Sequence, residues 1–201
     1  MSSLKAEAFI EHPPQSRVLH LCALTDLTDM PRVGFRGGDS AAYLQTRGYR
    51  LPERPNQALR QEDGGWLARL SQTEYLLLGS LADDGARIAA EEARWTQDSQ
   101  RNYLLPRQDS HAWMQLSGRH CSAVMAKLCG VDLRAQAFAV GAVAQTSAAR
   151  INVIVVNVGS EALPALQLLF DRASLAYFRE AVLDAMGEFE GGLVAADALK
   201  D

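Results

Sequence analysis

The chain has 201 residues, of which 48% are hydrophobic and 22% are charged. This composition is typical of a globular protein and excludes a disordered, collagen-like or fibrous chain. A chain of this length can bury about 70% of its surface on folding, so the fold needs neither a metal nor a disulfide to hold it. The formal net charge of −4 excludes a general nucleic-acid binder, because such proteins need a basic face.

Neither export nor a membrane partner is expected from the sequence. The longest purely apolar runs hold four or five residues, as in 153–156, whereas a membrane-spanning helix needs about 20. Charged residues and the Pro13-Pro14 pair interrupt the first 20 residues, which therefore lack the apolar core of a signal peptide. The three cysteines are an odd number without CxxC spacing, and they predict buried free thiols in a cytoplasmic protein.

Residues 1–30 are predicted to form an irregular N-terminal arm. Pro13-Pro14 breaks any helix there, and the apolar stretch 18–24 could be a strand or an extended cover over the core. From Arg32 to Arg36, polar and apolar residues alternate, which predicts a half-buried strand.

A turn and a helix should follow this strand. Gly37-Gly38 turns the chain, and Asp39 or Ser40 can cap a helix that runs to about Arg47. Gly48 is well placed to end this helix in a left-handed conformation. A loop, a two-stranded hairpin and a further helix are then predicted over residues 51–56, 66–70 with 74–78, and 83–98.

The second half of the chain repeats this order, and 82 residues separate Gly48 from Gly130. A strand over 109–116 precedes a helix that Ser117 can cap and Gly130 can end. The remaining predicted elements are strands over 142–149 and 151–158, a candidate strand over 164–170, and a helix over 174–189.

The duplicated order of strand, helix, strand, strand and helix predicts the fold class. Two split β-α-β units, each ferredoxin-like, indicate an α+β fold whose halves join their sheets and place helices outside. We expect halves at about 31–100 and 107–190, intertwined into one domain over 31–190. Residues 191–201 are predicted to be a mobile tail.

Two patterns could carry chemistry, and each also has a plain structural explanation. The turn at 36–38 could hold an anion at a helix N-terminus, but it lacks the glycine spacing of phosphate-binding loops. On a strand, Asp109, His111 and Trp113 would share one face, which allows an Asp–His couple or a polar edge or interface strand. No nucleophile motif accompanies the couple.

A metal site and docking of the last predicted helix on a partner are no better supported than these two patterns. The pairs His20/Cys22 and His120/Cys121 do not place two ligands on one face of a helix or strand. The apolar stripe of the last helix could lie on a partner, although such stripes more often face a core. The residues alone therefore predict no catalytic, cofactor-binding or metal-binding side chain.

Several short stretches, found in the expected order, carry a resemblance to one known family. They resemble the gamma subunit of heterotetrameric sarcosine oxidase, and the likeness extends over about residues 20–190. The stretches are 24–28, 32–37, 107–113, 126–133 and 142–147.

The resemblance implies a non-catalytic structural or assembly subunit of a bacterial, cytoplasmic flavoenzyme. Such a complex oxidatively demethylates sarcosine to glycine with oxygen and tetrahydrofolate, and releases methylenetetrahydrofolate and hydrogen peroxide. The resemblance places FAD, covalently attached FMN and NAD in the alpha and beta subunits and zinc in the delta subunit, with no cofactor in this chain. The subunit is also similar to the N-terminal part of the glycine-cleavage aminomethyltransferases, whose domain is of the folate-binding type.

This family role implies contacts with the alpha subunit above all, and with the beta and delta subunits. Arginine and aromatic residues are favoured at the centres of interfaces. We therefore expect the segment with Arg107, Gln108, Asp109, His111 and Trp113 to lie at the interface.

Two alternatives stay open at this point. The chain could be a stand-alone folate-binding or one-carbon-transfer protein, because residues 63–70 resemble an aminomethyltransferase segment in which acidic residues follow a Gly-Gly pair. Here Ala68 and Arg69 stand in that place, the chain ends before a second domain, and no KGCYxGQ motif is present. The chain could also be the equivalent subunit of a dehydrogenase for another N-methyl amine.

Overall fold

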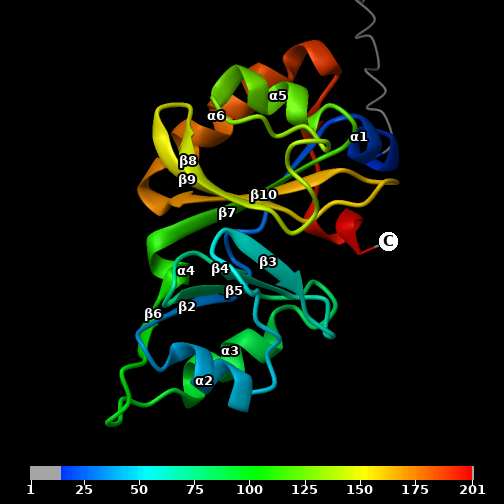
Figure 1. Cartoon of the computed structure of the whole chain (residues 1–201). Helices are drawn as coiled ribbons and strands as arrows, with labels where there is room; N and C mark the ends of the chain where they lie inside the picture. Colours follow the sequence, from blue (N-terminus) through cyan, green and yellow to red (C-terminus); the bar gives the residue numbers. More distant parts are fainter. Residues whose placement is uncertain (1–14, 201) are drawn as a thin grey trace, which may run out of the picture.

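The strands of both halves assemble into two mainly antiparallel sheets that pack face to face, with helices on the outer faces (Figure 1). The computed structural model describes residues 15–200. Its elements in chain order are α1 (Gln15–Leu21), β1 (Ala23–Asp26), β2 (Arg32–Arg36), α2 (Ser40–Thr46), β3 (Gln57–Arg60), β4 (Trp66–Arg69), β5 (Glu74–Leu78), α3 (Ala86–Arg94), β6 (Tyr103–Leu105), α4 (Arg107–Ser110), β7 (His111–Ser117), α5 (Cys121–Leu128), β8 (Val143–Ala148), β9 (Ile151–Asn157), β10 (Ala165–Asp171), η1 (Arg172–Ser174), α6 (Leu175–Met186), η2 (Gly187–Phe189), β11 (Gly192–Leu193) and η3 (Ala196–Leu199).

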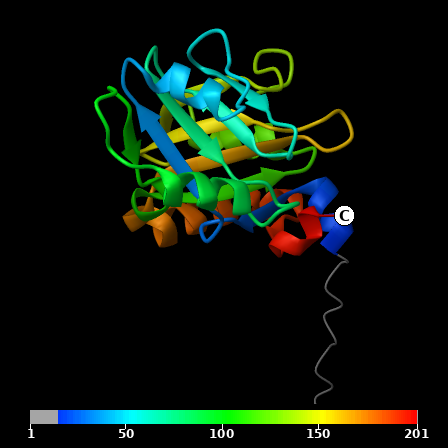
Figure 2. The ribbon, with the colours of Figure 1, turned by 90° about the horizontal axis from the view of Figure 1, so that it is seen from below.

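The two sheets and their helices form four layers. Sheet A has the strand order β11-β1-β7-β10-β9-β8, and sheet B has the order β3-β4-β5-β2-β6. Helices α5 and α6 cover the outer face of sheet A, and α2 and α3 cover the outer face of sheet B (Figure 1). The view from below looks onto α2 and α3 (Figure 2).

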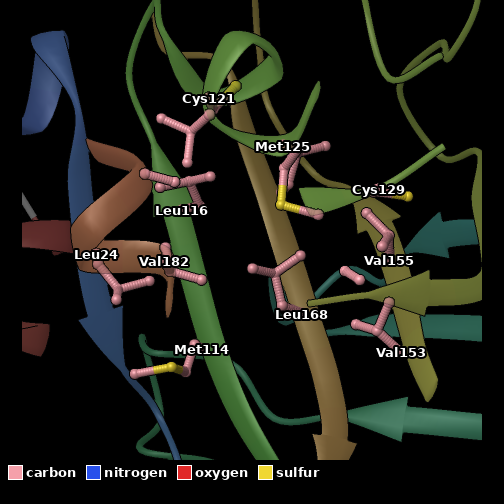
Figure 3. Close-up of a cluster of buried hydrophobic side chains, with 14 of the residues drawn as sticks. Leu24, Met114, Leu116, Cys121, Met125, Cys129, Val153, Val155, Leu168 and Val182 are labelled. Atoms are coloured by element: carbon pink, nitrogen blue, oxygen red, sulfur yellow. The ribbon is translucent and has the colours of Figure 1, made fainter. Parts of the chain in front are cut away.

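Alternating strand residues supply the apolar layers, because successive side chains of a strand point to opposite faces of its sheet. On β7, Met114 and Leu116 face the helices, whereas Trp113 lies in the middle layer with Leu169 and Ala68. The outer cluster of sheet A includes Leu24, Met114, Leu116, Cys121, Met125, Cys129, Val153, Val155, Leu168 and Val182 (Figure 3).

The two halves have the same topology. Each runs strand, helix, three antiparallel strands, helix: β2, α2, β3–β5 and α3 in the first half, and β7, α5, β8–β10 and α6 in the second. In each half the first strand pairs with the last strand of the three, as β2 with β5 and β7 with β10. The duplicated α+β fold predicted from the sequence is confirmed.

The halves also exchange strands. The strand β1 precedes the first half but pairs with β7 in sheet A, and β6 precedes the second half but pairs with β2 in sheet B. Each sheet therefore contains a strand from the other half, and the two connections that lead from β1 to β2 and from β6 to β7 lie against each other.

The predicted irregular arm is wrong where the structure describes it. Residues 15–21 form α1 and residues 23–26 form β1, whose strand state depends on pairing with β7 of the other half. Pro13-Pro14 and the rest of 1–14 lie outside the described residues. Likewise, the tail up to Lys200 carries β11 and η3, and Val194 is buried.

Other predicted boundaries need correction. A short helix, α4, takes up 107–110, so Asp109 is not on the strand that begins at His111. Helix α5 begins at Cys121 rather than beside Ser117, and Cys129 leaves it in an extended conformation that forms a bridge with Ala148. The predicted helix over 83–98 is shorter, α3, and strands β3 and β6 were not predicted.

Within residues 15–200, the structure contains no helix with the length and apolar character needed to cross a membrane.

Candidate functional site

The segment predicted as an interface lies where the two connections meet, and Arg32 holds it there. The Arg32 side chain is fully buried. Its Nη1 donates hydrogen bonds to the carbonyl oxygens of Thr28 and Met30 at 2.9 and 2.7 Å. Its Nη2 donates to the carbonyl oxygens of Gln108, at 3.3 Å, and His111. One guanidinium therefore links the β1–β2 connection to the segment between β6 and β7.

Arg32 forms no ion pair with a carboxylate among the described residues. Burial, with the nearby charge of Arg172, lowers the pKa of Arg32 to about 10, so it remains charged near neutral pH. Backbone carbonyl dipoles take the place of a counter-ion. We call the contact between the β1–β2 connection and the segment between β6 and β7 the crossing. Arg172 also supports it, because its Nη1 donates to the Gln108 carbonyl at 2.9 Å.

Three of the five predicted interface residues have internal partners. Arg107 is half-buried and forms an ion pair with Glu74 of β5. The amide of Gln108 donates to the Asp29 carbonyl at 3.2 Å. Trp113 is only 1% exposed and lies between the sheets. Its indole therefore cannot contribute to a contact surface on this chain.

Asp109 and His111 lie instead on a groove of about 1200 Å³ at the ends of β9 and β10. They do not form the Asp–His couple that a shared strand face would allow. The Nδ1 of His111 shares a hydrogen bond of 2.8 Å with the Ser110 hydroxyl. Asp171 is the partner of His111 in the β7–β10 register.

The electrostatics of this groove disfavour acid–base chemistry at His111. Burial, together with the positive charges of Arg107 and Arg32, lowers the pKa of His111 to about 4, against the opposite effect of Asp171. A histidine with this pKa is neutral at pH 7 and is a weak general base. The groove is therefore better suited to contact than to proton transfer.

A second cavity, of about 860 Å³, lies between the two sheets. We call it the inter-sheet cavity. Its sheet A wall includes Gln115 and Gln167, and Thr25 extends this polar row beyond the cavity, because the three residues are direct neighbours across β1, β7 and β10. All three are buried. The hydroxyl of Thr25, the Oε1 of Gln167 and the indole N–H of Trp113 have no hydrogen-bond partner among the described residues.

The sequence reasoning missed this polar row. The available signal was a glutamine at the centre of each of two apolar strands, Gln115 in β7 and Gln167 in β10. Strand register was needed to place them side by side.

On the sheet B side, Trp66 lines the cavity together with the polar residues Arg60, Asp63 and Ser80, and the apolar centre of sheet B lies beside the cavity rather than on its wall. Ala68 and Leu76 of β4 and β5 are fully buried in the middle layer. Arg69 points away from that layer: its guanidinium donates to backbone carbonyls of the 52–53 and 71–72 segments and lies 5.7 Å from the Tyr75 ring centroid. The position where the aminomethyltransferase resemblance implies an acid is therefore an alanine methyl.

Carboxylates near the middle layer are already paired. At the rim of the inter-sheet cavity, Asp63 accepts hydrogen bonds from Arg87 at 2.9 Å and from the Gly65 amide at 2.9 Å. The only buried carboxylate in the described part of the chain is Glu91, which bonds to Tyr43 and Arg47 between α2 and α3. No described acid faces the cavity as a buried, unpaired group.

The predicted anion turn is filled by the chain itself. The carbonyl of Arg101 lies 1.9 Å from where a Cβ on Gly37 would stand, and Gly37 has a φ of 147°. Asp39 accepts a hydrogen bond from the Arg101 amide at 2.8 Å and also pairs with the Arg101 guanidinium. Hydrogen bonds from Arg101 lower the pKa of Asp39. The Asp39 carboxylate therefore binds Arg101 and does not form the predicted side-chain cap on α2.

Metal and thiol chemistry also lack a site in the described residues. No three His, Cys, Asp or Glu side chains of 15–200 lie close enough together to share a metal ion. Cys22, Cys121 and Cys129 are buried free thiols, as the sequence predicts. Burial raises the pKa of Cys22 and Cys121 to about 11, which makes these thiols unreactive.

Comparison with known proteins bears on the identity of the chain. No protein-family model matches it. Over 195 residues it is 27% identical to the sarcosine oxidase subunit gamma of Corynebacterium sp. (strain P-1), and the match covers 94% of this chain and 92% of that protein. The resemblance predicted from short stretches of the sequence is confirmed.

Two solved structures share the fold. A chain of heterotetrameric sarcosine oxidase from Corynebacterium sp. U-96, in complex with pyrrole 2-carboxylate, has a TM-score of 0.67 at 20% identity, covering 90% of this chain and 93% of that one. The glycine cleavage system aminomethyltransferase T from Bartonella henselae has a TM-score of 0.65 at 15% identity, and the overlap covers 90% of this chain but 50% of the transferase. The chain therefore has the fold of one half of such a transferase.

Proposed function

We propose that the chain is the gamma-type subunit of a heterotetrameric flavoenzyme of the sarcosine oxidase type, with a structural rather than catalytic role. The observation that carries this proposal is the end-to-end match to a sarcosine oxidase gamma subunit. A match that covers nearly all of both chains argues for the same subunit rather than for one shared motif.

The chemistry of the two cavities supports a non-catalytic role. The groove at His111 offers a histidine that stays neutral and is a weak base at neutral pH. The inter-sheet cavity has glutamine amides on its sheet A wall, and of its two lining carboxylates Asp63 is paired with Arg87 and Glu62 is exposed to solvent. Neither offers an activated nucleophile or an acid–base pair.

The subunit would act by burying partner surface and so stabilising the assembled state. A partner that binds only the folded form of a protein shifts its folding equilibrium by mass action. We place the flavins FAD and FMN, together with NAD, in the alpha and beta subunits, and zinc in the delta subunit. The complex would act in the cytoplasm on sarcosine, with tetrahydrofolate as the acceptor of the one-carbon unit.

The test is co-purification. The tagged chain, co-expressed with the alpha, beta and delta subunits of its source, should retain all three together with the visible absorbance of their flavins. A tagged chain that elutes alone, while the other subunits form an active flavoprotein, would overturn the proposal.

Within this proposal, the exposed part of the predicted interface is the groove with Asp109 and His111. Asp109 is exposed and carries no ion pair among the described residues. Asp109→Arg should reduce the recovery of the alpha subunit at least about tenfold, because a reversed charge at an interface is strongly unfavourable. The matched control is Asp184→Arg on the exposed side of α6, which should leave recovery unchanged. Equal recovery with both variants would place the interface elsewhere.

A second candidate function, folate binding by this chain alone, is favoured by one observation, the polar row in the inter-sheet cavity. Titration of the isolated chain with tetrahydrofolate decides it. Saturable micromolar binding would support that function, whereas the missing acid at Ala68 predicts no binding. The identity of the N-methyl amine is tested separately, by comparing sarcosine with other N-methyl amines as substrates of the assembled complex.

A further inference from the structure

The C-terminal segment 194–200 lies beside α1 at one end of the two sheets (Figure 1), and its last residues line the inter-sheet cavity. At its start, Val194 is buried against α1 and β1, and its amide donates to the Leu24 carbonyl at 3.0 Å. At its end, Leu199 packs against the middle layer, and Leu199 and Lys200 form part of the cavity wall. The segment thus covers one side of a cavity that both sheets line.

Few interactions hold this segment beyond Val194. In the described part of the chain, the amides of Ala198 and Lys200 bond only within the segment, to the carbonyls of Ala195 and Asp197. The Lys200 ammonium contacts Asp84, in the turn before α3, at 2.8 Å, and both side chains are exposed to solvent. Its apolar contacts come from the partly buried Ala196, Ala198 and Leu199. A segment held by a few side chains, with no backbone hydrogen bonds to the rest of the fold, opens at lower free-energy cost than the strands of the sheets.

We propose that residues 195–200 are a lid on the inter-sheet cavity, hinged after Val194 and closed by the Leu199 side chain and the Lys200–Asp84 ion pair. The lid controls access to a wall that carries Gln115, Gln167 and Trp113. This role does not depend on the proposed function, because it concerns the folded chain alone.

Access can be measured by thiol labelling at the cavity wall. Gln167→Cys places a thiol on the polar row, where the side chain is buried and lines the cavity. Its labelling rate in the full-length folded chain reports lid opening. The buried Cys22, Cys121 and Cys129 belong to the outer cluster of sheet A or its helices and report global unfolding in the same sample.

Loosening the lid should raise the labelling rate of Gln167→Cys alone. Lys200→Gln or Asp84→Asn should raise it about two- to fivefold, the factor that corresponds to an exposed ion pair. Asparagine suits position 84 because it tolerates the left-handed backbone, and Asp84 has a φ of 50°. Leu199→Ala, which removes the apolar anchor, should raise the rate about tenfold.

The matched control removes the other carboxylate near Lys200. Asp197 lies 3.7 Å from the ammonium, so Asp197→Asn leaves the closing pair intact and should leave the rate unchanged. Lys200→Arg should also keep the parent rate, and 1 M salt should accelerate labelling in the parent but not in Lys200→Gln. Equal rates in the parent, Lys200→Gln and Leu199→Ala would overturn the proposal. So would a parallel increase at Cys22, Cys121 and Cys129, which would mean that opening is global.

Discussion

The two halves of the chain have the same topology but different residues where their connections meet. Arg32 begins β2 in the first half, and His111 begins β7 in the second. Arg32 is fully buried and binds carbonyls of both connections, whereas the His111 ring is half-buried and lies on an open groove. The comparison shows that the strand start of the first half supplies the side chain that holds the two connections together, whereas the longer first strand of the second half begins at the edge of a groove.

The inner faces of the two sheets differ in the same way. Sheet A presents Thr25, Gln115 and Gln167 to the middle layer, and sheet B presents Ala68 and Leu76. A polar row opposite an apolar wall cannot be closed by simple apolar packing, because buried polar groups need partners. Gln115 and Gln167 of this row line the inter-sheet cavity.

The largest effect is expected from breaking the crossing itself. Arg32→Met removes the donor shared by four carbonyl oxygens and should lower the free energy of unfolding by about 3 kcal/mol or more. Urea denaturation followed by circular dichroism measures the loss.

The matched control for this substitution is Arg172→Met, an exposed arginine that donates to the same Gln108 carbonyl. It should cost less than about 1 kcal/mol. A similar loss in both variants would mean that the crossing does not depend on the buried guanidinium.

His111, at the start of β7 in the second half, should affect stability through pH. The pKa of His111 is about 4 in the folded chain, against an ordinary value of 6.5. The unfolded chain therefore binds more protons between these values, and the free energy of unfolding falls as the pH drops from about 6.5 towards 4. We expect His111 to account for a loss of about 1–2 kcal/mol between pH 7 and pH 5.

Urea denaturation at several pH values tests this prediction. His111→Asn should reduce the change in the free energy of unfolding between pH 7 and pH 5. His20→Asn, at an exposed histidine of α1, should leave the pH dependence of the free energy of unfolding unchanged. An unchanged slope in His111→Asn would show that the folded chain accepts a proton at His111 as readily as the unfolded chain does.

The smallest effect concerns a hairpin turn that differs between the halves. In the β8–β9 turn of the second half, Ala149 and Arg150 have φ values of 47° and 67°, in the left-handed region that favours glycine. Arg150→Gly should therefore raise the free energy of unfolding by about 0.5–1 kcal/mol.

The β4–β5 turn of the first half provides a control in a hairpin without this backbone strain. Gln72 does not have a positive φ, so Gln72→Gly should give no gain. Thermal denaturation of both variants compares the turns. An increase in stability in both variants, or in neither, would contradict the prediction that only the β8–β9 turn is strained.

Local patterns were sufficient to predict much of the fold. Alternation predicted β2, and glycine placement predicted the end of α2 at Gly48, which has a φ of 78°. The β4–β5 hairpin and the repeated order followed from the same kind of signal. These features depend on neighbouring residues, and neighbouring residues are what a sequence pattern records.

Features that depend on the other half could not be predicted in this way. The short strands β1 and β6 owe their state to partners far along the chain. From the sequence alone, Arg32 is expected to be an exposed residue at the start of a strand. It is buried because backbone carbonyls of both connections, including that of Gln108, surround its guanidinium. Trp113 was placed at an interface because its type suits one, but the register puts it between the sheets.

The central claim is that the chain works as one subunit of a larger flavoprotein. Native mass spectrometry of the chain co-expressed with the alpha, beta and delta subunits tests it most directly. The account predicts one assembly that contains a single copy of this chain together with the flavin-bearing subunits. An assembly that forms with all its flavin but without this chain, while the chain is found as a free monomer, would contradict the account.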